Sequence, residues 1–268
     1  MRKFILLLSV FITPLLSGQV NVTKEEIKQK TDSIIVEGNL LYQFEKVAWV
    51  STDQALSLKD IKQQYGGYLI YQSDDSIKAI ILDKSRENCI YEMTYIHDFT
   101  IPNKEILVNR PLYEEEKELQ SVKNKIMKTI SEPAYQVTCQ EGYDLNFELI
   151  PYEQGYNLYI LTGTKKPDVI PLGNDYIFFA NKNGDIQSWR KFHSRLIATP
   201  TKYDREKITG IMHSHLRTEP YISATDICTF KLYGSYYGLK QFKVLSTALS
   251  TYFTYDVDSN TIEWKTME

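Results

Sequence analysis

The chain has 268 residues, with 31 Lys or Arg, 34 Asp or Glu and a formal net charge of −3 at pH 7. Charges of both signs are interspersed without a basic stripe, which argues against nucleic acid as a partner. Its three cysteines are too few for a disulfide-rich framework and form no Cys-x-x-Cys pair for a thiolate zinc site. Two alternatives remain for Cys89, Cys139 and Cys228: one Cys89–Cys139 bridge, or three small buried side chains.

The N-terminus has the build of a secretory signal peptide. Arg2 and Lys3 precede an apolar run over residues 4–16, and Ser17 and Gly18 supply the small residues of a cleavage site. The run is shorter than the roughly 20 residues that span a bilayer as a helix, although a retained anchor is the alternative. We therefore expect residues 1–18 to be a signal peptide. The mature protein is then exported, to the periplasm or beyond, without stable membrane insertion.

Residues 19–108 are expected to form an N-terminal α+β unit that packs as a separate small layer. Thr23 and Glu26 have capping-box spacing, and apolar residues recur as far as Phe44, so a helix is predicted there with Gly38 as a break. Turn-rich segments separate three β-patterned runs, which predicts an antiparallel meander over residues 68–72, 77–83 and 88–96.

Residues 109–268 are expected to form a second domain. Pro111, three following glutamates and one apolar face predict an amphipathic helix over 111–131. A helix is also predicted over 223–234, closed by Gly234, and Asn183-Gly184 indicates a hairpin turn. Strands are predicted in FELIPY, YNLYILTG, DYIFFANKNGDIQSWRKF, ITGIMHSH and a terminal meander of FKVLSTAL, YFTYDV and TIEWKT. The predicted fold class is α+β, with one mixed sheet over 111–265 flanked by the two helices.

Two of the four histidines lie in the segment GIMHSHLRTEPYISATDICTFKLYG, residues 210–234. Side chains two apart on a strand face the same side, so His213 and His215 would project together. Ser223 and Asp226 would share one face of the following helix, although this pair is also an ordinary N-cap arrangement. Two imidazoles and a carboxylate are a usual ligand set for catalytic zinc, with water in the fourth position. We therefore predict that His213, His215 and Asp226 bind zinc.

The pattern His-x-His, seven residues, Ser-x-x-Asp resembles the signature of the JAMM (MPN+) zinc metallopeptidases. The order of predicted elements over about residues 111–265 is also similar. The resemblance implies that His213, His215 and Asp226 hold zinc and that Ser223 stabilises an oxyanion. It further implies that zinc-activated water cleaves an amide bond, peptide or isopeptide, in a peptide or protein substrate. The stretches GNDYIFF and TDICT also resemble secreted proteins of Bacteroidetes-type bacteria.

The chain departs from the JAMM pattern at the general-base glutamate. The corresponding strand, YNLYILTG, contains no acidic residue. Glu153 just before that strand, Glu148 on the preceding strand and Glu219 in the loop after His215 are the substitutes nearest in sequence. His193 is expected to be a plain strand-end residue, with a role as a third imidazole as the alternative. The alternative to a hydrolase is therefore a non-catalytic binding or envelope-structural protein on a JAMM-like scaffold.

Overall fold

The structure is a computed structural model that describes residues 22–204 and 206–267. Helices and antiparallel sheets are both present, so the predicted α+β class is confirmed. The signal peptide predicted at residues 1–18 lies outside the described residues. Within the described part of the chain, no helix combines the length and the hydropathy needed to cross a bilayer.

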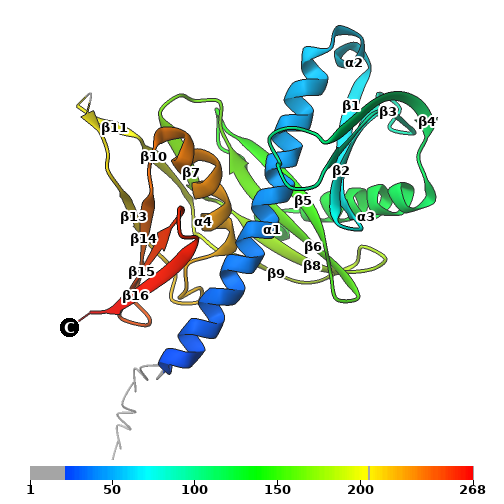
Figure 1. The fold of residues 1–268 in the computed structure, drawn as a ribbon. Helices are drawn as coiled ribbons and strands as arrows, with labels where there is room; N and C mark the ends of the chain where they lie inside the picture. The colour runs from blue at the N-terminus through cyan, green and yellow to red at the C-terminus, as the bar shows by residue number, and fades with distance from the viewer. Residues whose placement is uncertain (1–21, 205, 268) are drawn as a thin grey trace, which may run out of the picture.

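Helix α1, Lys24–Ser57, runs diagonally through the middle of the molecule (Figure 1). The predicted capping box is present: Thr23 Oγ1 accepts from Glu26 N, and the Glu26 carboxylate accepts from Thr23 N. The predicted break at Gly38 is wrong, because the helix continues through this residue. A Cβ at Gly38 would lie 2.8 Å from Ile227 Cβ on helix α4, Ala224–Thr229. The glycine therefore allows a close helix crossing.

The first sheet is the predicted antiparallel meander with one additional strand. Its order is β1-β2-β3-β4, with β1 Tyr65–Ser73, β2 Ser76–Asp83, β3 Asn88–Tyr95 and β4 Lys104–Pro111. Strand β4 lies at the edge and is mostly exposed, so it lacks the apolar alternation by which the other three were predicted. The short helix α2, Lys59–Gln64, precedes the sheet. Helix α3 spans Glu114–Ile130, and its predicted start at Pro111 is too early because this residue still belongs to β4.

The single mixed sheet predicted over residues 111–265 is wrong, because strand pairing divides these residues between two four-stranded sheets and two two-stranded ladders. One is antiparallel, in the order β5-β6-β8-β9, and comprises β5 Asp144–Tyr152, β6 Gly155–Gly163, β8 Tyr176–Asn181 and β9 Ile186–Lys191. The other is mixed, because β13 pairs parallel with β14, and comprises β13 Ile211–Ser214, β14 Gln241–Ser246, β15 Thr251–Asp256 and β16 Thr261–Thr266.

The two remaining ladders are short. Two antiparallel ladders are formed by β7 Val169–Gly173 with β10 Leu196–Pro200, and by β11 Lys202–Tyr203 with β12 Glu206–Lys207. The predicted turn at Asn183-Gly184 is confirmed, with Gly184 at φ +76° between β8 and β9. The predicted helix end at Gly234 is wrong, because a π-helical turn over Phe230–Gly234 and a 3-10 turn over Ser235–Tyr237 prolong α4 until Gly238, at φ +77°.

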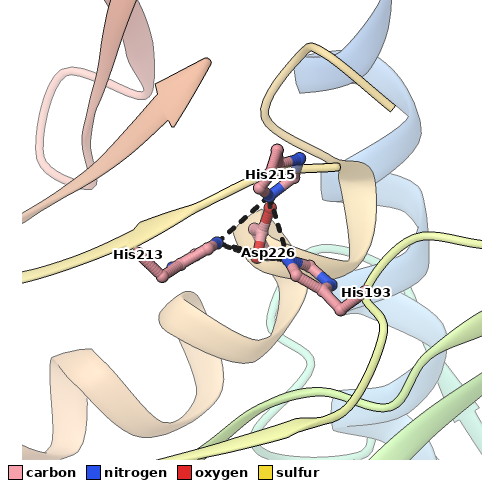
Figure 2. A group of neighbouring side chains, drawn as sticks. All are labelled: His193, His213, His215 and Asp226. Atoms are coloured by element: carbon pink, nitrogen blue, oxygen red, sulfur yellow. Dashed lines mark hydrogen bonds and ion pairs between the residues drawn. The ribbon is translucent and has the colours of Figure 1, made fainter. Parts of the chain in front are cut away.

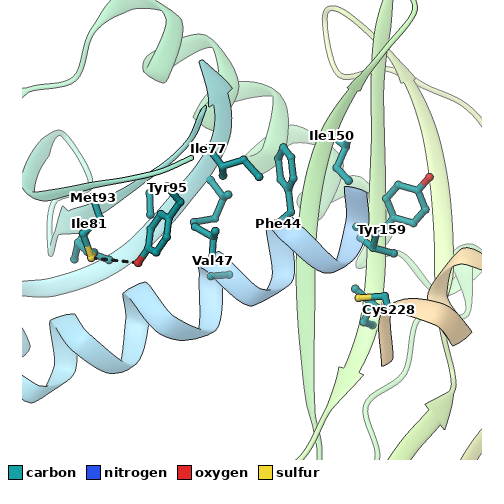
Figure 3. Packing of buried hydrophobic residues seen from close by; sticks show 14 of the residues in the cluster. Phe44, Val47, Ile77, Ile81, Met93, Tyr95, Ile150, Tyr159 and Cys228 are labelled. Atoms are coloured by element: carbon teal, nitrogen blue, oxygen red, sulfur yellow. Dashed lines mark hydrogen bonds between the residues drawn. The ribbon is translucent and has the colours of Figure 1, made fainter. Parts of the chain in front are cut away.

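One hydrophobic core crosses the expected boundary between residues 108 and 109. Phe44 and Val47 of α1 pack in the same cluster as residues from both antiparallel sheets and from α4, among them Ile77, Ile81, Met93, Tyr95, Ile150, Tyr159 and Cys228 (Figure 3). Helix α1 is therefore shared by the two halves of the chain.

The three cysteines are free. Cys89 and Cys228 are buried and Cys139 is exposed, so neither the predicted bridge nor the set of three buried side chains holds in full.

We expect Gly38→Ala to destabilise the protein. In an open helix this replacement stabilises by about 1 kcal/mol, but here the new methyl group would overpack Ile227, at a cost of about 1–3 kcal/mol. Urea unfolding measures the change in the free energy of unfolding. The control is Val36→Ala on the exposed face of the same helix, which should shift stability by less than about 0.5 kcal/mol. A Gly38→Ala chain more stable than the wild type would mean that the crossing has room for a side chain.

Candidate metal centre

Four buried side chains converge at the side of α4 (Figure 2). One ligand atom from each of His193, His213, His215 and Asp226 lies within 4.8 Å of the others. His213 lies on β13, His215 directly follows that strand, and Asp226 lies in the first turn of α4. The structure thus brings together the three residues predicted to bind zinc. His193 lies just after the end of β9, but its ring is buried in the same cluster, so the alternative of a third imidazole describes it better than a plain strand-end residue.

The distances between the four groups are close to those of a tetrahedral ligand set. The Nε2 atom of His193 lies 3.2 Å from that of His213 and 2.9 Å from that of His215, and the last two are 3.1 Å apart. Asp226 Oδ1 lies 3.2 Å from His213 Nε2 and 3.4 Å from His193 Nε2, and Asp226 Oδ2 lies 2.9 Å from His215 Nε2. Zinc bonds to nitrogen of about 2.0–2.1 Å place tetrahedral ligand atoms about 3.3 Å apart. A slight outward movement of the rings would therefore accommodate an ion.

The donor set itself fits a divalent metal ion. Three Nε2 atoms in a triangle cannot all be satisfied by one another, because a neutral imidazole carries a single N–H. Asp226 Oδ1 is buried and has no hydrogen-bond partner among the described residues. An ion of charge +2 would satisfy this oxygen and would neutralise the two buried carboxylates, Asp226 and Asp175. Imidazole with carboxylate suits zinc and other first-row transition metals.

Neighbouring groups aim the Nε2 atoms inward. His193 Nδ1 donates to Asp175 Oδ1 at 2.7 Å, and Asp175 Oδ2 accepts from the Thr225 hydroxyl. His215 Nδ1 donates to the backbone carbonyl of Glu219 at 3.2 Å. With Nδ1 protonated in this way, Nε2 keeps its lone pair for a metal. Two of the three imidazoles are thus held in the tautomer and orientation that metal binding requires.

Ser223 is the N-cap of α4, which confirms the N-cap arrangement that the sequence offered as the alternative for Ser223 and Asp226. Its Oγ accepts from Asp226 N at 3.1 Å and lies 2.8 Å from Asp226 Oδ2, to which it donates. The backbone N–H of Ser223 donates to the same oxygen at 2.9 Å. The serine therefore holds the ligand carboxylate in place. Its oxyanion role stays a prediction.

The three candidate general bases lie in different surroundings. The Glu219 carboxylate pairs with Arg190 at 3.5 Å, and burial raises its pKa. Glu153 is exposed in the turn between β5 and β6, with φ +47°. Glu148 is buried beside Glu45, and neither Glu148 nor Glu153 belongs to the metal cluster. Glu219 contacts the cluster through its backbone carbonyl, not through its carboxylate.

The electrostatics of the cluster favour a bound cation. Burial opposes a charge on Asp226, but the three imidazoles hold its pKa well below its usual range. Burial likewise opposes protonation of His193, yet Asp175 and Asp226 outweigh this effect and raise its pKa to about 9. The same negative potential that holds a proton on His193 would attract a divalent ion, so protons and metal compete for the site.

No protein-family model, no curated protein and no solved structure matches this chain. The JAMM resemblance therefore stays a prediction from the motif at 213–226 and from the predicted order of elements. Because the structure adds His193 as a fourth neighbour, the cluster differs in composition from the predicted three-ligand set. The chain has four histidines, and three of them meet here.

We expect Asp175→Asn to weaken metal binding by about 10- to 100-fold without removing a ligand. The amide would no longer provide the negative charge that orients and polarises the His193 ring, and loss of such a group has this size of effect. Competition with a chromogenic chelator measures the affinity. Asp185→Asn, an exposed change on the β8–β9 turn, is the matched control. Equal affinities for the two variants would contradict the role of Asp175.

We expect Glu148→Gln to stabilise the protein at pH 8 and to have little effect at pH 4. Burial, followed by the charge of Glu45, raises the pKa of Glu148 well above its usual range. The folded state therefore holds this proton more tightly than the unfolded state. The associated stability is fully present below the unfolded pKa of about 4.3 and is lost as the pH rises through the higher folded value. Melting temperatures at both pH values test this, with exposed Glu153→Gln as the control.

Proposed function

We propose that this chain is a metal-binding scaffold protein in which one zinc ion, held by His193, His213, His215 and Asp226, has a structural role. The position of His193 carries the proposal: its Nε2 lies 2.9 Å and 3.2 Å from those of His215 and His213. A protein ligand thus stands where a hydrolytic site would keep a place for water. Structural zinc sites are closed by four protein ligands, whereas catalytic sites keep one position open.

Burial of the ligands supports the same function. His193 and Asp226 are 2% and 1% exposed, and His213, the most exposed of the four ligands, is 9% exposed. The ion would join the segment after β9, the end of β13 and the start of α4, and when bound it supplies folding free energy. Ser223 and Asp175 act here as positioning residues, because each holds one ligand in its orientation. The non-catalytic alternative from the sequence is therefore the better supported.

A second candidate is the exported JAMM-like hydrolase that cleaves an amide bond. The observation that favours it is a small cavity, of about 40 Å³, lined by Glu219, Tyr221 and Ser223. In this function His213, His215 and Asp226 alone would hold the zinc, and Glu219 would leave Arg190 to move a proton. His193 would have to turn away from the centre. Export is proposed for either function, from the composition of residues 1–18.

The variant His193→Ala separates the two functions. For a structural centre we expect about one zinc per chain in the dialysed wild type and loss of that zinc in His193→Ala. Removal of the ion should also lower the melting temperature, because a ligand at 100 times its Kd stabilises the folded state by about 2.7 kcal/mol. Metal analysis and thermal unfolding provide both readouts, and exposed His97→Ala is the matched control.

The opposite outcome supports the hydrolase. His193→Ala would then keep its zinc, and the wild type would cleave peptide or isopeptide probes with a rate that falls in Ser223→Ala. A wild-type chain that binds no zinc and no other first-row metal would exclude both functions.

A further inference from the structure

A pocket that contains none of the metal ligands lies beside the second half of α1. Its volume is about 320 Å³, within the range of about 300–1,000 Å³ typical of small-ligand sites. It is called the Trp49 pocket below. The side chains that determine its chemistry come from α1, β1, β5, the segment after β6 and the π-helical turn, and they are Trp49, Asp53, Tyr68, Asp144, Lys165 and Tyr233.

Three aromatic side chains form walls of the Trp49 pocket. Trp49, Tyr68 and Tyr233 all line it, and each is partly buried, so each keeps accessible surface. The rings of Trp49 and Tyr233 meet at 79° with their centroids 5.0 Å apart, as two adjoining walls. The ring of Tyr68 already lies near one cation, because Lys123 Nζ is 4.9 Å from its centroid. Aromatic faces carry negative potential, so these walls favour a positively charged ligand.

The charged side chains of the lining select the same sign. Asp53 and Asp144 supply two carboxylates, and Lys165 supplies one ammonium group. All three are exposed, so their charges act on a ligand through solvent and are weakened by salt. The lining therefore carries an excess of one negative charge, which complements a cation.

The buried charges behind the aromatic walls do not reverse this sign. The Glu45 carboxylate accepts from Trp49 Nε1 at 2.8 Å, so it adjoins the indole. Glu45 opposes the positive charge of Lys123. Burial raises the pKa of Tyr233, and the charge of Glu45 adds to this effect. The potential at the Tyr233 hydroxyl is therefore negative.

We propose that the Trp49 pocket binds a small quaternary ammonium ligand. Such a cation has no N–H group, so aromatic faces can replace its hydration shell without hydrogen bonds. A primary ammonium group would need three acceptors in place of three waters, whereas the carboxylates of Asp53 and Asp144 are exposed and act mainly through their charge. No metal ligand lines the pocket. The proposal therefore goes beyond the structural role of the zinc centre and does not depend on it.

The test is a titration of the ¹⁵N-labelled chain with choline, followed by NMR of the tryptophan side chains. We expect a saturable shift of the Trp49 indole N–H signal, with a Kd of about 1 mM for a ligand of this size. The indole signals of Trp189 and Trp264, which do not line the pocket, should stay in place. The uncharged isostere 3,3-dimethylbutan-1-ol should bind about fivefold more weakly. Equal binding of this alcohol, tighter binding of butylammonium, or no saturable shift of Trp49 would overturn the proposal.

Charge variants at exposed positions assign the site without disturbing the fold. Asp53→Asn combined with Asp144→Asn should weaken choline binding about fivefold, because two attractive charges are lost. Lys165→Gln removes the opposing charge and should tighten choline binding about twofold. Neither change should alter binding of the alcohol. Lys182→Gln, at an exposed lysine on the β8–β9 turn, is the matched control and should bind as the wild type does. Unchanged choline binding by the double variant, or equal effects of the two lysine variants, would refute the assignment to this pocket.

Discussion

The burial of two carboxylates beside three imidazoles is the constraint around which the C-terminal half is arranged. Asp175 and Asp226 are each 3% exposed or less, so their charge has to be balanced locally. The balance depends on α4, because this short helix carries both Asp226, a member of the cluster, and Thr225, which bonds to Asp175. Helix α4 in turn lies where α1 crosses it at Gly38. The lack of a side chain at Gly38 thus helps to determine where the two carboxylates and the three imidazoles meet.

Local patterns were sufficient for much of the fold. The two-residue period of a strand predicted that His213 and His215 share a side, and the capping spacing at Thr23 and Ser223 predicted both helix starts. Tertiary packing decided the rest. Gly38 is an unfavourable helix residue by propensity alone, yet contact with α4 overrides this effect. The division into two sheets depends on which strands pair over long distances, and no local pattern records those partners.

The candidate site could also be predicted only in part, because local patterns do not record contacts between residues far apart in the sequence. Three of its members lie within one fourteen-residue motif, whereas His193 lies twenty residues before His213 and reaches the cluster through the fold. The substitutes for the general base were chosen by proximity in sequence, and proximity in sequence did not place Glu148 or Glu153 in the cluster. Ser223 illustrates a different limit: capping the helix and holding a ligand carboxylate require the same hydroxyl in the same place, so the motif alone cannot separate them.

Arg190 lines a groove between α1 and the sheet β5-β6-β8-β9, and it also pairs with Glu219 beside the metal cluster. Its guanidinium lies 3.5 Å from the Glu219 carboxylate, and the Glu219 backbone carbonyl accepts from His215 Nδ1. Any occupant that pulls Arg190 away from Glu219 alters the group that orients a metal ligand. Thermodynamic reciprocity then applies: if the ion changes the affinity of the groove by some factor, the occupant changes the affinity for the ion by the same factor. Under that condition, occupancy of the groove and occupancy of the cluster are linked through Glu219.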